Sequence, residues 1–533
     1  MSALDNNAPD SGTVNAGKSY GSTYSGKEMA GYLTGLVGQN IIYNIINSGW
    51  DHFIHYVIYI PSKAILVFQS LARIWDAIND PMMGSVVDKT RTKWGKCKPY
   101  LMFVPPLICL ITILNFVNGS YTESVAAGGS GMGIIIWCAV AYILWGMSYT
   151  IGDIPLWGVT SLMTEKEKDR SKILSMARVF SMLGAVGMMT PYLGQALANV
   201  TPDMTPVEQA AAYRHGFLLS AVILTVFSTV LFEFSGLSVH ERVSQSKKSY
   251  TLKENFRTMA TCEPFRRLLI SGILRSPNAL LQTAAIPLVT YYFFRGDIMT
   301  AISEGFSVKM IVTLLLLVVG IIGGMIVGSI MTPGIAEKTG KKRLYNVYSL
   351  LGAVPYALLF VLYLLTGGDV KSSMFIVIVL ALLMFCAAWT MGGLNVLQSV
   401  MIADCIDYEE YNRGVRTDGV FFSGQSFITK LNSGIGSILT NAVFGFVGWT
   451  DANIEAANNA LKSGQDFLSI EGGKYAMMFF FLISIPPAIG MALSAIPTLR
   501  YKLTDKEHQR ILDALIERRA EKKTAEETAV SED

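Results

Sequence analysis

Asp76 and Asp80 lie four residues apart in an otherwise apolar stretch of the chain. A helix would place both carboxylates on one face, with Asn79 beside them. The flanking sequence is apolar enough to span a membrane, where one aspartate at the centre costs about 2.5–3.5 kcal/mol. A bound cation or proton in a water-filled cavity compensates this cost, so the pair indicates an ion path. The alternative is a buried ion pair with a basic residue on another helix.

A later apolar segment carries residue types that suit a sugar. Asp153 and Trp157 lie one helical turn apart, and Tyr149 lies one turn before them. A carboxylate accepts hydrogen bonds from two hydroxyl groups, and an indole ring covers the apolar C–H face of a pyranose. Trp157 alone would indicate core packing, but its position beside Asp153 favours sugar binding.

Two basic residues, Arg178 and Lys430, also lie in apolar segments, where they are costly unless paired. We therefore predict one central cavity in which the three carboxylates face these two basic groups. Charge neutrality in that cavity would depend on what is bound, which is the basis of coupling. We expect Arg275 to extend towards the aqueous boundary. Neutral hydrogen-bonding residues expected in the cavity are Asn40, Gln425 and Asn432.

The composition is that of a membrane protein. Of the 533 residues, 51% are hydrophobic and only 16% are charged, and the mean hydropathy is +0.41. The six cysteines have neither metal-site spacing nor the pattern of a disulfide scaffold. We find no nucleophile–base arrangement, phosphate loop or HExxH motif, so we expect neither an enzyme nor a cofactor, and no nucleic-acid partner.

Apolar segments of about 20 residues predict an all-α membrane protein with twelve spanning helices. The spans are expected at residues 30–58, 62–87, 99–118, 131–162, 173–198, 216–238, 266–294, 308–332, 343–366, 373–403, 417–448 and 475–498. An echo between the sequences after the second and eighth spans indicates two six-helix halves, as in secondary transporters. The expected division is a disordered tail at 1–28, helical bundles at 29–238 and 266–498, a linker at 239–265 and a C-terminal tail at 499–533.

Basic residues are concentrated in every second loop, such as 89–98 and 166–172, whereas the intervening loop 119–131 has none. The positive-inside rule therefore places both termini in the cytoplasm of a multi-pass cell-membrane protein. In the C-terminal tail, Thr504 and Glu507 have the spacing of a capping box. We expect a surface helix there that packs on loops or on the membrane, or binds a partner. Its apolar face comprises Ile511, Leu512, Leu515 and Ile516.

Four strings carry a resemblance to a known family. In chain order they are RIWDAINDPMMGSVVDKTRTKWGKCKPY, YTIGDIPLW, ADCIDYEEYNRGVRTDG and SFITKLNSG. Together they resemble the glycoside–pentoside–hexuronide:cation symporter family of the major facilitator superfamily, over nearly the whole chain from the first span to the last. The resemblance implies the major facilitator fold and symport of a glycoside with Na⁺ or H⁺ by alternating access.

The resemblance also implies roles for individual residues. The cation-binding residues are Asp76, Asn79, Asp80 and Thr150. The substrate-binding residues are Asn40, Tyr149, Asp153, Trp157, Arg178, Gln425 and Lys430. The gating residues belong to a repeated loop motif that closes the cytoplasmic side: Gly84, Asp88, Arg91, Gly95 and Lys96 in the first copy, and Glu337, Lys338 and Arg343 in the second. For the lysines, we favour the alternative of solvated loop charges.

The identity of the substrates stays open from the sequence. Asn40 stands where the galactoside carriers have a second sugar-binding aspartate, and the lost negative charge would suit a uronide held by Arg178. The three cavity aspartates oppose an anion and favour a neutral glycoside or pentoside. The neutral oxygens of Asn79 and Thr150 favour Na⁺ over H⁺.

The expected partners are a sugar, a monovalent cation and the lipid bilayer, with a monomer as the functional unit. Other interpretations are a proton-coupled exchanger of another small polar solute and a non-transporting membrane sensor on the same fold.

Overall fold

The computed structural model is almost entirely helical in the residues that it describes. These residues are 24–164, 166–201, 203–243, 254, 257, 260–293, 308–449 and 451–532. Most of the predicted N-terminal tail and of the linker at 239–265 lies outside them. The first helix begins at Gly26, where the Ser25 hydroxyl accepts a hydrogen bond from the backbone N–H of Glu28.

The first half of the chain contains ten α-helices longer than four residues in its described part. They are α1 (Gly26–Asn44), α2 (Asp51–Tyr56), α3 (Ser62–Lys89), α4 (Lys98–Phe103), α5 (Pro105–Leu114), α6 (Tyr121–Ala126), α7 (Met132–Gly158), α9 (Glu167–Met182), α10 (Thr190–Leu197) and α11 (Pro206–Ser238), with the short α8 (Thr160–Met163) after α7.

The described helices of the second half end in a long C-terminal one. They are α13 (Glu263–Leu274), α14 (Leu280–Leu288), α16 (Val308–Val318), α17 (Gly324–Thr339), α18 (Lys341–Leu365), α19 (Met374–Arg413), α20 (Asp418–Val447), α21 (Asp451–Lys462), α22 (Lys474–Leu499) and α23 (Asp505–Glu532).

Each of the twelve predicted spans is largely helical in its described residues, so the predicted fold class is confirmed. Several spans are divided by short π-helical or 3₁₀ stretches: Ile45–Trp50, Leu183–Met189, Ser276–Ala279, Val289–Phe293 and Val319–Gly323. Seven described helices are long and apolar enough by themselves to cross a membrane. The helix α3 is not among them, because it carries the polar residues of the candidate site.

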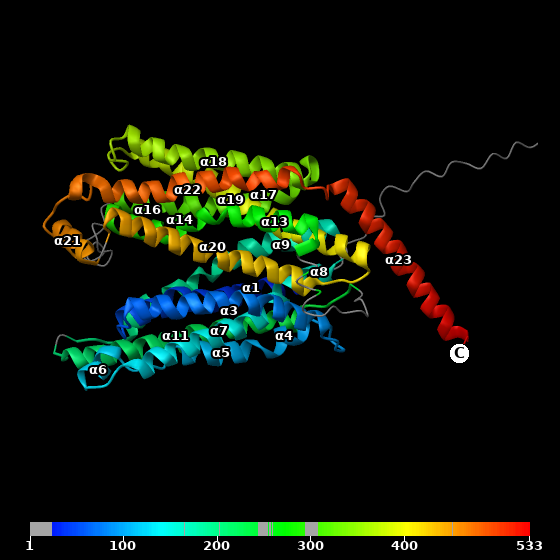
Figure 1. Ribbon diagram of the computed structural model, residues 1–533, viewed down its shortest axis with the longest axis horizontal. Coiled ribbons are helices and arrows are strands. Elements are labelled where there is room, and N and C mark those ends of the chain that lie inside the picture. Colours follow the sequence, from blue (N-terminus) through cyan, green and yellow to red (C-terminus); the bar gives the residue numbers. More distant parts are fainter. Residues whose placement is uncertain are drawn as a thin grey trace, which may run out of the picture.

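The helices form two bundles that lie side by side (Figure 1). In the first bundle α1 packs along α11, and in the second α18 packs along α22. The bundles meet where α3 contacts α20 and where α9 contacts α17 and α19. The polar face of α3 is thereby directed towards the second half of the chain.

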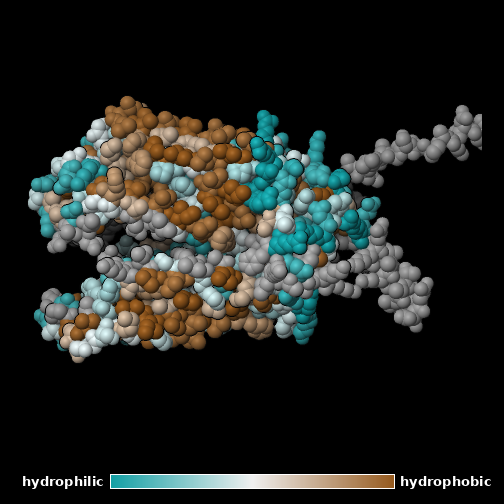
Figure 2. All heavy atoms as spheres, in the orientation of Figure 1, coloured by the Kyte–Doolittle hydropathy of each residue, from teal (hydrophilic) through white to brown (hydrophobic). Residues whose placement is uncertain are grey.

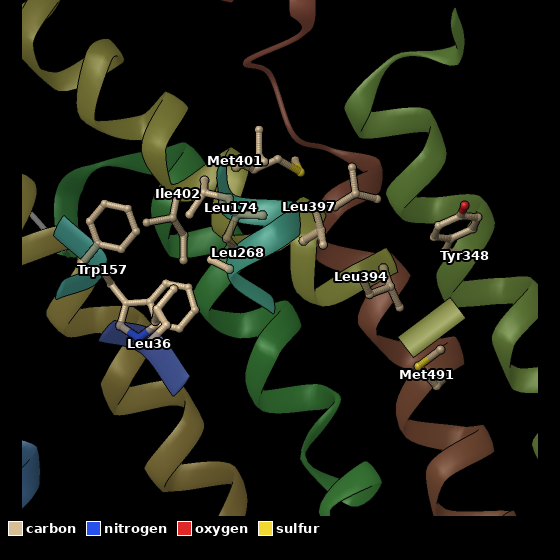
Figure 3. Packing of buried hydrophobic residues seen from close by; sticks show 14 of the residues in the cluster. Leu36, Trp157, Leu174, Leu268, Tyr348, Leu394, Leu397, Met401, Ile402 and Met491 are labelled. Atoms are coloured by element: carbon tan, nitrogen blue, oxygen red, sulfur yellow. The ribbon is translucent and has the colours of Figure 1, made fainter. Parts of the chain in front are cut away.

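On the face shown in Figure 2, an apolar belt crosses both bundles, and hydrophilic residues gather at the two ends. The surface is hollowed between the bundles at the end that carries α6 and α21, which we term the open end. The opposite end, which carries α23, is termed the closed end. Near it the apolar core is continuous between the bundles: Leu174 of α9 belongs to the same buried cluster as Met401 and Ile402 of α19 (Figure 3).

The structure extends several helices beyond their predicted limits. The tenth span was expected to end at residue 403, whereas α19 continues to Arg413. A hydropathy criterion stops at the last apolar residue, but the charged turns that follow are buried in ion pairs at the closed end. The short helices α6 and α21 at the open end were not predicted.

Candidate functional site

A cavity of about 540 Å³ lies between the two bundles. Helices α1, α7, α9 and α20 line it, and all seven residues expected to bind substrate are among its lining residues. The complete lining is Gln39, Asn40, Tyr43, Tyr149, Asp153, Trp157, Arg178, Gln425, Ser426, Thr429 and Lys430. The spacing along α7 accounts for part of this arrangement, because Tyr149, Asp153 and Trp157 follow one another at one-turn intervals on a single face.

The carboxylate of Asp153 is held by residues from both halves of the chain. Gln39 Nε2 donates to Asp153 Oδ1 at 2.8 Å, and Ser426 Oγ donates to Asp153 Oδ2 at 3.2 Å. Gln39 also donates to the hydroxyl of Tyr149. The sequence analysis did not select Gln39, although it adjoins Asn40 in the same apolar segment. Unlike Asn40, it belongs neither to the quoted strings nor to the positions that the resemblance assigns to the substrate.

Two amides of the predicted site differ in position. Asn40 lines the cavity, and its Nδ2 donates to the Leu36 carbonyl at 2.9 Å and to Gln39 Oε1 at 2.7 Å. Asn432 is not part of the cavity lining and contacts Ser276 Oγ at 2.5 Å, so its predicted place there is wrong. It follows Lys430 by two residues, which turns its side chain about 200° around the helix.

Lys430 forms a buried ion pair with the two aspartates of α3. Its Nζ lies 2.7 Å from Asp80 Oδ1 and 3.4 Å from Asp76 Oδ1. Thr150 Oγ1 donates to the same Asp80 oxygen at 3.0 Å and accepts from Lys430 at 3.1 Å. The alternative interpretation from the sequence, a pair with a basic residue on another helix, therefore describes this conformation.

The ion pair leaves part of the site unsatisfied. Asp80 is fully buried, and its Oδ2 has no hydrogen-bond partner among the described residues. The neighbouring Asn79 is 4% exposed, and its Nδ2 also lacks a described partner. A second cavity, of about 420 Å³, is lined by Asp76 and shares Lys430 with the first. Lys430 thus stands between the carboxylate pair and the larger cavity.

Two arginines lie against one turn of α19. Arg178 Nη2 donates to Ser399 Oγ at 2.6 Å, and its guanidinium carbon lies 4.3 Å from the centre of the Trp157 ring. Arg275 Nη2 donates to Gln398 Oε1 at 2.5 Å and to Asn395 Oδ1 at 3.2 Å. Arg275 is only 6% exposed, so the expectation that it extends to the aqueous boundary is wrong. It caps the C-terminus of α13, where a 3₁₀ turn follows and the side chain finds polar partners on α19.

Lys96 ties the two halves together at the closed end. Its Nζ lies 2.8 Å from Asp88 Oδ1 and 2.7 Å from Asp418 Oδ2. Asp88 also accepts hydrogen bonds from the backbone N–H groups of Gly419 and Val420, each at 3.0 Å. Lys96 is 2% exposed, so the interpretation of this lysine as a solvated loop charge is wrong.

Gly84 allows α3 and α20 to approach each other beside this ion pair. A Cβ atom at this position would lie 2.5 Å from the carbonyl oxygen of Gly419, which is closer than carbon and oxygen can pack. The nearby Arg91 donates to the carbonyl of Asp88 at 2.6 Å and stays near the surface. Gly84 therefore allows the close contact between α3 and α20, and Asp88 connects the two helices at the closed end.

A second ion-pair network crosses between the halves, and the sequence analysis did not identify it. Arg170 of α9 contacts Asp404 at 3.2 Å and Asp407 at 2.9 Å, both on α19. Arg416 contacts Asp407 at 3.0 Å and donates to the Ser161 carbonyl at 3.1 Å. Asp404, Asp407 and Arg416 were visible in one of the quoted strings, but they follow the last apolar residue of a span and therefore resembled a solvated loop. Arg170 lies in the basic loop 166–172, which was assigned to the solvent-exposed cytoplasmic side.

The second copy of the loop motif is only partly engaged. Glu337 contacts Lys168 of the other half at 3.3 Å, but both side chains are exposed. Arg343 is exposed. The buried basic residue is instead Lys341, which contacts Glu167 at 2.6 Å and pairs with Asp404.

The C-terminal helix α23 packs on this network through a histidine. His508 is fully buried, with Nδ1 3.3 Å from Glu167 and Nε2 3.1 Å from Asp407. Burial lowers the pKa of His508, but the charge of Asp404 and the hydrogen bonds with Asp407 and Glu167 outweigh it and raise the pKa to about 9. Ile511 and Leu515 of the predicted apolar face are also buried. The helix therefore bridges both halves.

A cavity with buried charges between two helical bundles is the arrangement of a secondary transporter. The fold and the site thus define a multi-pass membrane transporter, which is not an enzyme. The model of the family described as MFS/sugar transport protein matches residues 31–505, and the chain belongs to this family. The resemblance inferred from the four sequence strings is confirmed.

Relatives cover nearly the whole chain. The isoprimeverose transporter of Lactiplantibacillus pentosus is 26% identical over 496 residues, 93% of this chain and 91% of that protein. The inner membrane symporter YicJ of Escherichia coli is 25% identical over 500 residues, 92% of this chain and 94% of that protein. The crystal structure of the E. coli fucose:proton symporter superposes with a TM-score of 0.53 at 14% identity, over 89% of this chain and 98% of that one. This last likeness concerns the fold alone.

Proposed function

We propose that this protein carries a sugar across the cell membrane together with a monovalent cation, Na⁺ or H⁺, by alternating access. The observation that supports this most is the ammonium of Lys430 between Asp76 and Asp80, beside a cavity that contains Asp153 and Trp157. The carboxylate pair already holds a positive charge where a coupling ion would bind. A relative named as a putative glycoside/cation symporter is consistent with the proposal.

In this proposal the cation binds between Asp76 and Asp80, with Thr150 and Asn79 beside them. Asp80 Oδ2 is buried without a described partner, which is the kind of oxygen that a cation would satisfy. The Thr150 hydroxyl already contacts the other oxygen of Asp80. Neutral oxygens next to a carboxylate pair suit Na⁺, because a metal ion uses several oxygen ligands and a proton does not.

The sugar binds in the larger cavity. Asp153 accepts hydrogen bonds from sugar hydroxyl groups, and Trp157 lies one turn away for the apolar face of the ring. Gln39, Asn40 and Gln425 supply neutral donors and acceptors. No cofactor takes part, since the cation is transported with the sugar.

Lys430 couples the two substrates. It lines the sugar cavity and at the same time contacts the carboxylate pair, so a cation that neutralises the pair competes with its ammonium. The displaced ammonium then becomes available to donate to the sugar. A cation thus increases the affinity for sugar, which links the two binding events.

We place the closed end in the cytoplasm, with both chain termini, because the basic loops gather there. The conformation described here is then outward-open, with the cytoplasmic side closed by the Lys96 and Arg170 networks. The apolar belt faces lipid, in the inner membrane of a cell that has two. One chain supplies every residue of the site, so a monomer is sufficient.

The proposal is tested by uptake of labelled glycosides, pentosides and hexuronides into vesicles that contain the purified protein. At least one sugar should enter faster under an inward Na⁺ or H⁺ gradient than without it. A non-transporting sensor would bind sugar without any gradient-driven uptake, and that result would reject symport.

A further inference from the structure

We propose that Glu233 of α11 binds the ammonium headgroup of phosphatidylethanolamine in the membrane around the closed end. This inference goes beyond the proposed function, because it concerns the lipid-facing side of the first bundle and neither the sugar cavity nor the carboxylate pair. Its basis is an acidic side chain in a spanning helix for which the described residues supply no partner.

Glu233 lies on the side of α11 that borders the lipid. Its side chain is partly exposed, and Val230, Phe234 and Leu237 around it are exposed apolar residues. These neighbours lie before and after Glu233 along the helix, so the carboxylate is within the apolar part of the span. A charge at such a position is costly unless a partner compensates it.

No described residue is that partner. Glu233 forms no hydrogen bond or ion pair within the described part of the chain. The helices packed against α11 include α1, α4, α5 and α10, and neither α5 nor α10 contains a lysine or arginine. Lys98 of α4 donates to the Val239 carbonyl at 2.8 Å, and Lys27 of α1 is exposed at the start of that helix. A compensating charge therefore has to come from the surroundings, which at this position are lipid.

The carboxylate lies close to the level of the lipid headgroups. Gly236, three residues further along α11, packs on α4, and a Cβ atom there would lie 2.6 Å from the Leu101 carbonyl oxygen. Two residues on in α4, the exposed ring of Phe103 lies 5.9 Å from that of Trp94, which is also exposed. Tryptophan is enriched at the boundary between membrane and water. Glu233 is about 4.5 Å along the helix axis from Gly236, which is within one turn of this boundary.

The groups around this position accept hydrogen bonds. Pro105 and Pro106 have no N–H, so the carbonyl oxygens of Leu101 and Met102 lose their usual helical donors. Together with the carboxylate of Glu233 they form a set of acceptors with a negative charge. A primary ammonium supplies the opposite charge and three N–H donors. The quaternary ammonium of phosphatidylcholine has the same charge but no N–H, so the site should distinguish the two lipids.

The first test measures lipid binding to the purified full-length protein by native mass spectrometry. The probes have identical acyl chains and differ only in the headgroup: phosphatidylethanolamine, its N-methyl and N,N-dimethyl derivatives, and phosphatidylcholine. The N–H donors decrease along this series while the charge of the nitrogen stays constant at neutral pH. Phosphatidylethanolamine should bind about tenfold more tightly than phosphatidylcholine, with the two derivatives between them.

Glu233→Gln removes the charge and keeps the size of the side chain. In this variant the preference for phosphatidylethanolamine over phosphatidylcholine should fall below about twofold. Glu517→Gln is the control, because it removes one negative charge from an exposed position on α23, outside the spanning helices. It should keep the preference of wild type. An unchanged preference in Glu233→Gln would overturn the proposal.

A second test locates the lipid in wild type and needs no variant. A carbodiimide activates a carboxyl group, which then forms an amide with a neighbouring primary amine while the reagent takes up the water as a urea. Peptide mass spectrometry should find phosphatidylethanolamine coupled to Glu233. Coupling at other carboxyl groups but not at Glu233 would reject the site, and so would equal binding of all four lipids to wild type, as expected if Glu233 is protonated. Gradient-driven uptake of sugar tests the proposed function separately.

Discussion

Replacing Lys430 with glutamine removes the ammonium from the carboxylate pair while it keeps a polar side chain in the cavity. The ammonium lies 2.7 Å from Asp80 and 3.4 Å from Asp76, and these two carboxylates are 0% and 14% exposed. Removing one partner of such a buried pair costs about 3–5 kcal/mol. We therefore expect Lys430→Gln to melt at a markedly lower temperature than wild type in buffer without Na⁺.

Adding the coupling cation should reverse this loss. A cation at one hundred times its dissociation constant stabilises a protein by about 2.7 kcal/mol. In wild type the cation must displace Lys430, so its apparent affinity is lower and the stabilisation is smaller at a given concentration. Na⁺ should thus raise the melting temperature of the variant more than that of wild type.

The assay is thermal unfolding of the purified protein, with NaCl replacing choline chloride at constant ionic strength and pH. A second series lowers the pH in the absence of Na⁺. If the melting temperature of the variant rises more than that of wild type in this series, the coupling ion is a proton. Lys371→Gln is the control, because its partner Asp466 lies 3.0 Å away in a pair that is 28% and 45% exposed. Such pairs contribute about 0–1 kcal/mol. Equal cation dependence of Lys430→Gln and wild type in both series would refute the competition between ammonium and cation.

Three further predictions concern other parts of the molecule. Asp153→Asn should weaken sugar binding about 10–100-fold, because it removes a charged acceptor, while Na⁺ still raises the melting temperature; normal sugar affinity would contradict this role. Lys96→Met should loosen the closed end, since breaking one side of a buried salt bridge costs about 3–5 kcal/mol. The thiol of Cys97 is 0% exposed in wild type, so a thiol reagent should label it faster in the variant, in a background without the other cysteines. An unchanged labelling rate would contradict this prediction. The pKa of His508 is raised from 6.5 to about 9, so its stabilisation of α23 packing is complete below about pH 6.5 and is lost as the pH rises through 9; spin-label distances from α23 to the bundle should lengthen over that range in wild type, and a pH dependence retained in His508→Gln would exclude this histidine.

Much of the architecture could be predicted from the sequence, because lipid imposes a simple rule on a spanning segment. Each segment must be apolar and long enough to cross the bilayer, which located all twelve spans. The same rule identified Asp76, Asp80 and Lys430 as candidate functional residues, because a charge within an apolar segment is costly unless it is compensated. Helical spacing then placed Asp76 and Asp80 on one face, and the need to compensate buried charges predicted that Lys430 faces them.

Other features depend on tertiary contacts that no local pattern reveals. The partners of Arg170 on α19 follow the end of an apolar segment, where the sequence does not distinguish a buried charge from a solvated one. Arg275 was misjudged because the end of α13 and the 3₁₀ turn after it direct the side chain towards α19. Gln39 was missed because its hydrogen bond to Asp153 on another helix is a tertiary contact that no sequence motif marks.

The central claim is that the carboxylate pair on α3 couples cation movement to sugar transport. The most direct measurement is the steady-state accumulation of a labelled substrate in vesicles with an imposed inward cation gradient, for wild type and Asp80→Asn. We predict accumulation above the external concentration in wild type, and equilibration without accumulation in Asp80→Asn, with substrate binding retained. Accumulation to the same level in both proteins would contradict the account.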